Sequence, residues 1–283
     1  MRSNCDPLLL LAMTACNQAF GLDQTRKFDA GRYDAPIDAP FACPRNGSEP
    51  PTYSPFLHQD VAEDCTDYSI SPAGRAVALC FVDRVHVNHV AEGSPDRALQ
   101  PVIDLVPPEQ FFRPRLSPDG QRMLVQVTLS SAFTVREYTR MADGSWQRGA
   151  DAPFGTSFYD GISTIARGPT GDRVLVSRTD LSVHEWAHEG STWREVLVET
   201  AGELGTPVAE IVITSDGLRA VISSISSSSN SMMFYTDRID ESSKFRRAVL
   251  LVGVTPLSSH FLTDDCARVY VTGVGSIFYA QQL

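Results

Sequence analysis

The chain has 283 residues, of which 42% are hydrophobic and 20% are charged, and this composition is ordinary for a globular protein. Its net charge of −10 and its scattered lysines and arginines offer no basic surface for a phosphate backbone, so we expect no nucleic-acid partner. No stretch reaches the roughly 18 to 20 apolar residues of a spanning helix. We therefore expect a mature protein that is soluble or is held at a membrane by other means.

Residues 1–15 have the features of an export signal. Arg2 lies in a short head, an apolar run follows, and two small residues precede Cys16. Residues 13–16, Met-Thr-Ala-Cys, resemble the lipobox of bacterial lipoproteins. The resemblance implies cleavage before Cys16, lipidation of that cysteine and stable anchoring through two or more acyl chains.

The residue after the lipobox also bears on the destination. Asn17, rather than Asp, follows the cysteine, which in lipoproteins favours the outer membrane, on its periplasmic or its surface face. The alternatives are an ordinary cleaved signal peptide and an N-terminal helix included through a start-site error. Labelling with a radioactive fatty acid distinguishes them.

Acidic residues and prolines without apolar periodicity fill the next segment, 16–48. Such a stretch cannot bury enough apolar surface to offset the entropy of ordering. We predict a disordered tether over 16–48 and a folded body over 49–283.

Five corner motifs repeat through that body, and their last residues are separated by 46, 51, 46 and 49 positions. Ser or Thr, Pro, Asp and Gly are each favoured in tight turns, Gly because it accepts positive φ. The corners are Ser71-Pro-Ala-Gly74, Ser117-Pro-Asp-Gly120, Gly168-Pro-Thr-Gly171, Thr214-Ser-Asp-Gly217 and Thr263-Asp-Asp-Cys266.

Short strand patterns flank these corners. One apolar strand precedes each corner, as at 210–213, and another follows, as at 173–177. A third strand rich in aromatic and β-branched residues and a fourth strand come next, as at 133–138 and 193–198. Four antiparallel strands per repeat of this length predict an all-β, five-bladed β-propeller.

The last repeat ends early, because the chain stops at Leu283 after a third strand at 275–280. Residues 51–56 are the candidate for its missing outer strand. We therefore expect an N-terminal strand to close the ring and remove an unpaired edge.

The Ser-Pro-Asp-Gly corner followed by a β-strand resembles the WD-repeat-like blades of the TolB propeller family. The resemblance covers residues 60–283, is strongest at 117–125 and departs at Ala73, Thr170 and Cys266. It implies a periplasmic or envelope protein that binds other proteins. Related blades occur in peptidases and lyases, and the corner itself carries no chemistry.

Four cysteines remain besides Cys5 and Cys16, which is an even number in an exported chain. If Ser71 pairs with Gly74, then Cys65 lies opposite Cys80; a bulge at Gly74 would instead turn the two thiols to opposite faces. We favour the Cys65–Cys80 disulfide, with Cys43–Cys266 as the second, and buried free thiols as the alternative.

His184-Glu-Trp-Ala-His188 matches the H-E-x-x-H pattern of zinc peptidases, which needs a helix to bring its histidines together. The segment falls on a predicted third strand, where four residues span about 13 Å. We therefore expect no metal site and two solvent-facing histidines.

Nucleotide and nucleophile-elbow motifs are missing from the sequence, so no cofactor is expected. The serine run 223–231 is predicted to be a loop.

One set of polar residues lies seven positions before each corner glycine or its equivalent. First strands line a propeller channel, so these side chains are candidates for a ligand-binding ring, or else they are solvated strand ends. In the ligand-site interpretation the two carboxylates form a pair and the arginine orients an anion. The set is Asp67, Arg113, Thr164, Glu210 and Ser259.

These features predict a monomeric envelope lipoprotein that binds a protein or a glycan, without catalytic residues. The alternative is a hydrolase or lyase that acts on carbohydrate or lactone in the channel. Fold alone does not choose between them.

Overall fold

The protein is described by a computed structural model covering residues 51–59, 65–70, 75–80, 84–89, 100–104, 109–129, 132–157, 160–168, 171–225, 231–252, 254, 259–273 and 276–283. All of these belong to one compact unit, Pro40–Leu283. The predicted signal peptide (1–15), the lipidation site Cys16 and the tether (16–48) lie outside the described residues.

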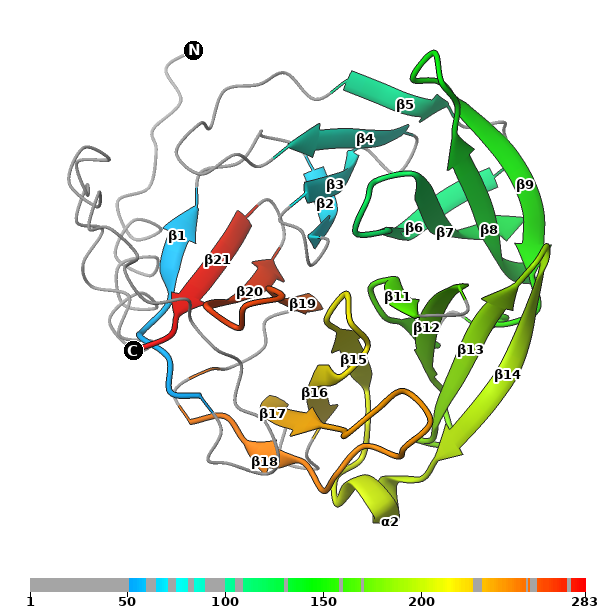
Figure 1. Ribbon diagram of the computed structural model, residues 1–283. Helices are drawn as coiled ribbons and strands as arrows, with labels where there is room; N and C mark the ends of the chain where they lie inside the picture. The colour runs from blue at the N-terminus through cyan, green and yellow to red at the C-terminus, as the bar shows by residue number, and fades with distance from the viewer. Residues whose placement is uncertain are drawn as a thin grey trace, which may run out of the picture. The chain divides into compact units, whose positions relative to one another are not determined.

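The strands form antiparallel sheets, and four of the sheets are built from strands that follow one another along the chain. Within each sheet the first strand is innermost (Figure 1). The first two of these sheets contain β2 (Cys65–Ile70), β3 (Arg75–Cys80), β4 (Arg84–His89) and β5 (Gln100–Asp104), then β6 (Glu109–Leu116), β7 (Arg122–Leu129), β8 (Ala132–Arg140) and β9 (Trp146–Ala152).

The third sheet has five strands rather than the predicted four, because its inner strand is divided around residues 163–165. The fourth sheet has an outer strand of only two residues. The two sheets contain β10 (Gly161–Ile162), β11 (Ala166–Gly168), β12 (Gly171–Ser177), β13 (Val183–Glu189) and β14 (Thr192–Glu199), then β15 (Glu210–Ile213), β16 (Arg219–Ile225), β17 (Ser231–Asp237) and β18 (Val249–Leu250).

The remaining sheet combines both ends of the described chain, in the order β1-β21-β20-β19. β1 (Leu57–Gln59) pairs antiparallel with β21 (Ser276–Gln281). Ser54 N–H also donates to the Gln281 carbonyl at 2.8 Å. The inner strands are β19 (Ser259–Leu262) and β20 (Arg268–Gly273).

The sheets stand around a common centre, with their outer strands at the rim (Figure 1). Hydrophobic clusters fill the spaces between neighbouring sheets: Phe154 and Ile162 belong to one, Leu175 and Ile211 to another. This arrangement confirms the predicted all-β propeller of antiparallel sheets.

The three corners that the structure describes in full have the predicted turn chemistry. In Ser117–Arg122 the serine Oγ accepts the Arg122 N–H at 2.9 Å and donates to Asp119 Oδ1 at 2.6 Å. Gly120 has φ 68°, which its missing Cβ permits. The same bonds recur at Thr214–Arg219 and Thr263–Arg268.

Cys266 occupies the glycine position of the last corner, with φ 58°. It is fully buried and disulfide-bonded, and its predicted partner Cys43 lies outside the described residues. Cys65 lies opposite Cys80 in the backbone register, because a bulge between Cys65 and Asp67 shifts the pairing by one residue. The bond between that pair stays a prediction.

The serine run does not form the predicted loop at its two ends. Ser223 and Ser224 lie in β16, where both are buried, and Ser231 begins β17. The β16–β17 pairing extends through these positions and satisfies their backbone groups, so the strands continue into the serine run.

One short helix, α2 (Ala201–Leu204), joins the third sheet to the fourth. Thr200 caps it in a capping box with Glu203, and Gly205 ends it with φ 75°. No helix within the described ranges is long and apolar enough to cross a membrane.

Candidate functional site

Three charged or titratable side chains meet at the centre of the propeller. Arg115 on β6 reaches Glu210 on β15, where Nη2 lies 3.0 Å from Oε1. His260 on β19 lies on the other side of the same carboxylate, with Nδ1 3.6 Å from Oε2. We call Arg115, Glu210 and His260 the axial cluster.

Arg115 contacts three other sheets and is fully buried. Besides Glu210, its Nε donates to the Ile162 carbonyl at 2.7 Å. Its guanidinium lies 5.4 Å from the centre of the Phe261 ring. The sheets of Arg115 and Glu210 are not neighbours along the chain, so this ion pair joins the inner strands of two separate sheets.

The predicted ring residues have different surroundings. Glu210 belongs to the axial cluster. Thr164 is buried, and its Oγ1 bonds the backbone of Ile213 in the next sheet. Arg113 donates from Nη1 to the Asp160 carbonyl at 2.8 Å rather than to Glu210. Asp67 lies on β2 and Ser259 on β19, and their side chains are outside the described part of the structure.

The sequence pattern selected Arg113 and missed Arg115 because β6 is irregular. Its pairing with β7 shifts register between Phe112 and Arg115, and Arg113 itself has φ 44°. Pro114 is the residue in the sequence that indicates this bulge, because proline cannot donate a backbone hydrogen bond within a sheet and is typical of bulges. His260 was missed because the pattern selected its neighbour Ser259.

The H-E-x-x-H segment lies on β13, as predicted, but its histidines do not face solvent. His184 is half-buried and His188 is buried, because the face of β13 that carries them is covered by neighbouring side chains. His184 Nδ1 lies 3.2 Å from Glu195 Oε2, and His188 Nε2 lies 3.7 Å from Glu137 Oε2. The prediction of solvent exposure was therefore wrong.

Burial and the nearby Arg122 guanidinium lower the pKa of His188, whereas the Glu137 and Asp172 carboxylates raise it. The net shift is downward, so this imidazole is neutral at pH 7. Among the described residues, no three His, Cys, Asp or Glu side chains are grouped so as to hold a metal ion.

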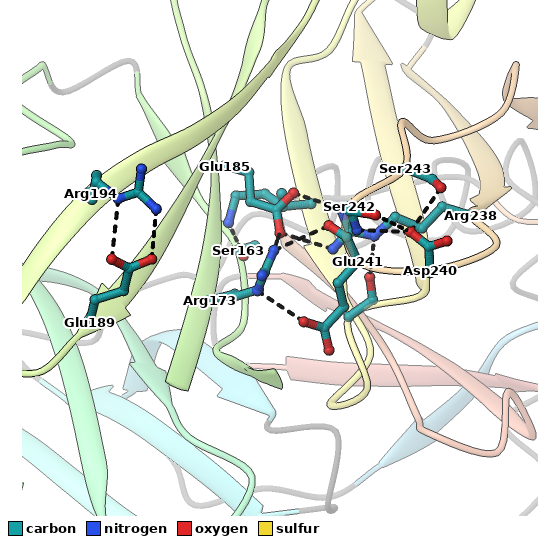
Figure 2. Close-up of polar contacts among 12 residues, drawn as sticks. Ser163, Arg173, Glu185, Glu189, Arg194, Arg238, Asp240, Glu241, Ser242 and Ser243 are labelled. Atoms are coloured by element: carbon teal, nitrogen blue, oxygen red, sulfur yellow. Dashed lines mark hydrogen bonds and ion pairs between the residues drawn. The ribbon is translucent and has the colours of Figure 1, made fainter. Parts of the chain in front are cut away.

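Because side chains alternate along a strand, the glutamate of the same motif lies on the opposite face of β13. It forms a second charged network, which Figure 2 shows. Glu185 receives two bonds from the Arg238 guanidinium, of 2.6 and 2.9 Å, and one from Arg173 Nη1 at 2.9 Å. Arg173 Nε also lies 3.1 Å from Glu241 Oε2. This bidentate, buried network ties the third sheet to the fourth and serves the fold.

No protein-family model and no curated protein matches the sequence. Solved structures with a similar fold include a gluconolactonase from Xanthomonas campestris, at 13% identity and a TM-score of 0.46 over 76% of this chain and 71% of the other. TolB from Acinetobacter baumannii is similar at 10% identity and a TM-score of 0.46, over 78% of this chain and 55% of TolB. The chain therefore spans about half the length of that protein.

The β-propeller domain of Cps50 (Swd1) from Myceliophteria thermophila is also similar, at 12% identity and a TM-score of 0.41, over 74% of this chain and 66% of the domain. Identities this low concern the fold alone. The chain is a β-propeller, and its structural neighbours include TolB, the family that the Ser-Pro-Asp-Gly corners resemble.

Proposed function

We propose that this chain is a non-enzymatic binding module, a five-bladed propeller closed by β1 and held at the bacterial envelope through lipidated Cys16. The observation that carries the proposal is the axial cluster. Its arginine and glutamate neutralise each other at 3.0 Å, so this pair acts as a structural tie between two sheets. The faces and loops of the propeller then remain for a protein or a glycan.

The proposed five-bladed closure is supported by the pairing of β1 with β21. Tyr53, just before β1, is buried and donates from its hydroxyl to the Cys266 carbonyl at 2.9 Å. The proposed disulfides, Cys65–Cys80 and Cys43–Cys266, would fasten the first and last repeats. Typical bridges contribute about 2–4 kcal/mol each.

The envelope location follows from the sequence alone, through the lipobox resemblance at 13–16. In this proposal the anchored protein is a monomer, on the periplasmic or the surface face of the outer membrane. Its partner is an envelope protein or glycan, and it uses no cofactor.

A binding and activity comparison tests the proposal. The chain, with Cys16→Ser to keep it soluble, is applied to isolated envelopes and to glycan arrays, and it is screened against generic ester, lactone and glycoside substrates. We expect saturable binding that excess unlabelled chain competes away, and no turnover. Glu195→Gln, at an exposed carboxylate outside the axial cluster, is the matched control.

Turnover that disappears in Glu210→Gln or Asp67→Asn, but persists in Glu195→Gln, would contradict the binding module. It would favour the hydrolase or lyase instead. Circular dichroism of each variant separates lost chemistry from lost fold.

A further inference from the structure

In the axial cluster, the Nδ1 nitrogen of His260 is buried without a hydrogen-bond partner among the described residues. His260 is fully buried, and its Nε2 lies 3.0 Å from the Val221 carbonyl oxygen. A carbonyl only accepts, so the neutral ring carries its proton on Nε2 and presents a lone pair at Nδ1. Nδ1 has no hydrogen-bond partner in the described part of the protein.

The Nδ1 lone pair faces another acceptor. Glu210 Oε2 lies 3.6 Å away, while the second oxygen of that carboxylate is bonded to Arg115. A proton on Nδ1 would turn this contact into a charge-assisted N–H···O bond. It would also leave two buried cations, His260 and Arg115, sharing one anion.

We infer that His260 Nδ1 and Glu210 Oε2 form a proton-binding site on the propeller axis, and that Arg115 opposes its occupation so that mild acid destabilises the ring. The inference does not depend on what the propeller binds. Its failure would leave the proposed binding function untouched.

The surroundings of the site set the direction of the effect. Burial lowers the pKa of His260 and so does Arg115, whereas Glu210 and the bond to Val221 raise it, and the net shift is downward. β20 places Val271 opposite His260, and β2, which also packs against β19, carries Asp67.

The lowered pKa fixes the sign of the stability change. An unfolded histidine takes up its proton near pH 6.5, whereas the folded chain resists it until lower pH. Stability that is fully present above about pH 6.5 is therefore lost as the pH falls below that value.

Two measurements on the full chain test the inference. A long-range nitrogen–proton NMR titration follows each histidine ring, and chemical unfolding is measured from pH 7.5 to 5. We expect His260 to show the Nε2–H tautomer and to titrate below 6.5. Below pH 6.5 the unfolding equilibrium constant of the unaltered chain should rise up to tenfold more per pH unit than that of His260→Gln.

Glutamine keeps a hydrogen-bond donor for the Val221 carbonyl but does not titrate. The variant therefore separates the effect of protonating His260 from the effect of losing that bond. The matched control is His184→Gln, since His184 is also a strand histidine beside a carboxylate, at 3.2 Å. His184→Gln should keep the acid sensitivity of the unaltered chain.

Titration of His260 at or above 6.5, an Nδ1–H tautomer, or equal acid sensitivity in the unaltered chain and His260→Gln would each overturn the inference. If His260→Gln does not fold, the NMR titration of the unaltered chain decides alone.

Discussion

Buried carboxylates in this propeller differ in how their charge is compensated. Glu185 is surrounded by two guanidiniums, whereas Glu199, 2% exposed, receives one bond, from the Phe245 N–H at 2.5 Å. The pKa of Glu199 is raised to about 7, mainly by burial and also by the nearby Glu185 carboxylate, while the Phe245 bond, Arg238 and Lys244 only partly offset the rise. The number of cationic and hydrogen-bonding partners around a buried carboxyl group thus decides how far burial raises its pKa.

Replacing Glu199 by Gln should remove the part of the stability loss, on raising the pH through 7, that comes from ionising this carboxyl group. The unfolded carboxyl ionises near pH 4.5, whereas the folded one keeps its proton to about pH 7. Stability from this group is therefore full below about pH 4.5 and is lost as the pH rises through 7, by about 3 kcal/mol. Urea unfolding of the unaltered chain and Glu199→Gln at pH 4.5, 6 and 8 measures the difference.

The control lies on the same strand: Glu195→Gln changes an exposed carboxylate of β14 and should follow the unaltered chain across this range. Parallel pH profiles for the unaltered chain and Glu199→Gln would show that Glu199 is already ionised in the fold. The raised pKa would then be wrong.

At the scale of the element, the corner hydroxyls hold the first two strands of a sheet together. Ser117 is fully buried, and its Oγ accepts N–H groups from Arg122 at 2.9 Å and Gln121 at 3.2 Å. The same turn recurs around Thr214 and Thr263, so a hydroxyl side chain at one position specifies the same corner in three sheets.

Ser117→Ala should destabilise the protein by about 1–3 kcal/mol, because it leaves the Arg122 N–H without its acceptor in a buried turn. Ser117→Thr keeps the hydroxyl, as the natural Thr214 and Thr263 corners do, and should lose less than a third of that. Guanidinium unfolding of the three chains provides the comparison. Equal losses in both variants would mean that the hydroxyl bond does not matter and that packing at this site does.

Local chemistry explains which elements the sequence could predict. The corners follow from the φ and hydrogen-bond preferences of single residues, and β15 was predicted at its observed bounds, Glu210–Ile213, from its apolar run. The axial pairing of Arg115 with Glu210 joins positions 95 residues apart. It depends on a bulge in β6, and no periodic pattern encodes the side to which a bulged residue turns.

The same limit applies to burial. The sequence placed His184 and His188 on a third strand, which is correct, but predicted that both side chains face solvent. In a propeller each sheet packs against two neighbours, so both faces of its middle strands are covered. Alternation within one strand says nothing about what lies beyond the sheet.

Across the whole molecule, polar contacts join one sheet to the next. Thr164 bonds the backbone of Ile213, and Ser215 N–H donates to Asp264 Oδ1 at 2.7 Å. The first sheet follows the segment 51–59, which pairs with the last sheet. We therefore expect the contact between this segment and the last sheet to contribute to the stability of the fold.

Substitutions of Tyr53 test the contact between segment 51–59 and the last sheet. It is 5% exposed, it belongs to the hydrophobic cluster that contains Val269 and Phe261, and its hydroxyl donates to Cys266. Tyr53→Ala should cost roughly 3 kcal/mol and lower the melting temperature, since it empties a buried ring site and loosens β1 from β21. Tyr53→Phe should cost only about 1 kcal/mol, because it removes the hydrogen bond but keeps the ring.

Scanning calorimetry of the two variants separates packing from the hydrogen bond, and hydrogen exchange of the β21 amides reports on the edge itself. Faster exchange at residues 277–279 in Tyr53→Ala, but not in Tyr53→Phe, is the expected result, because those residues pair with β1. If Tyr53→Ala left both the melting temperature and that exchange unchanged, the N-terminal segment would be an attachment to the last sheet and the ring would be stable without it.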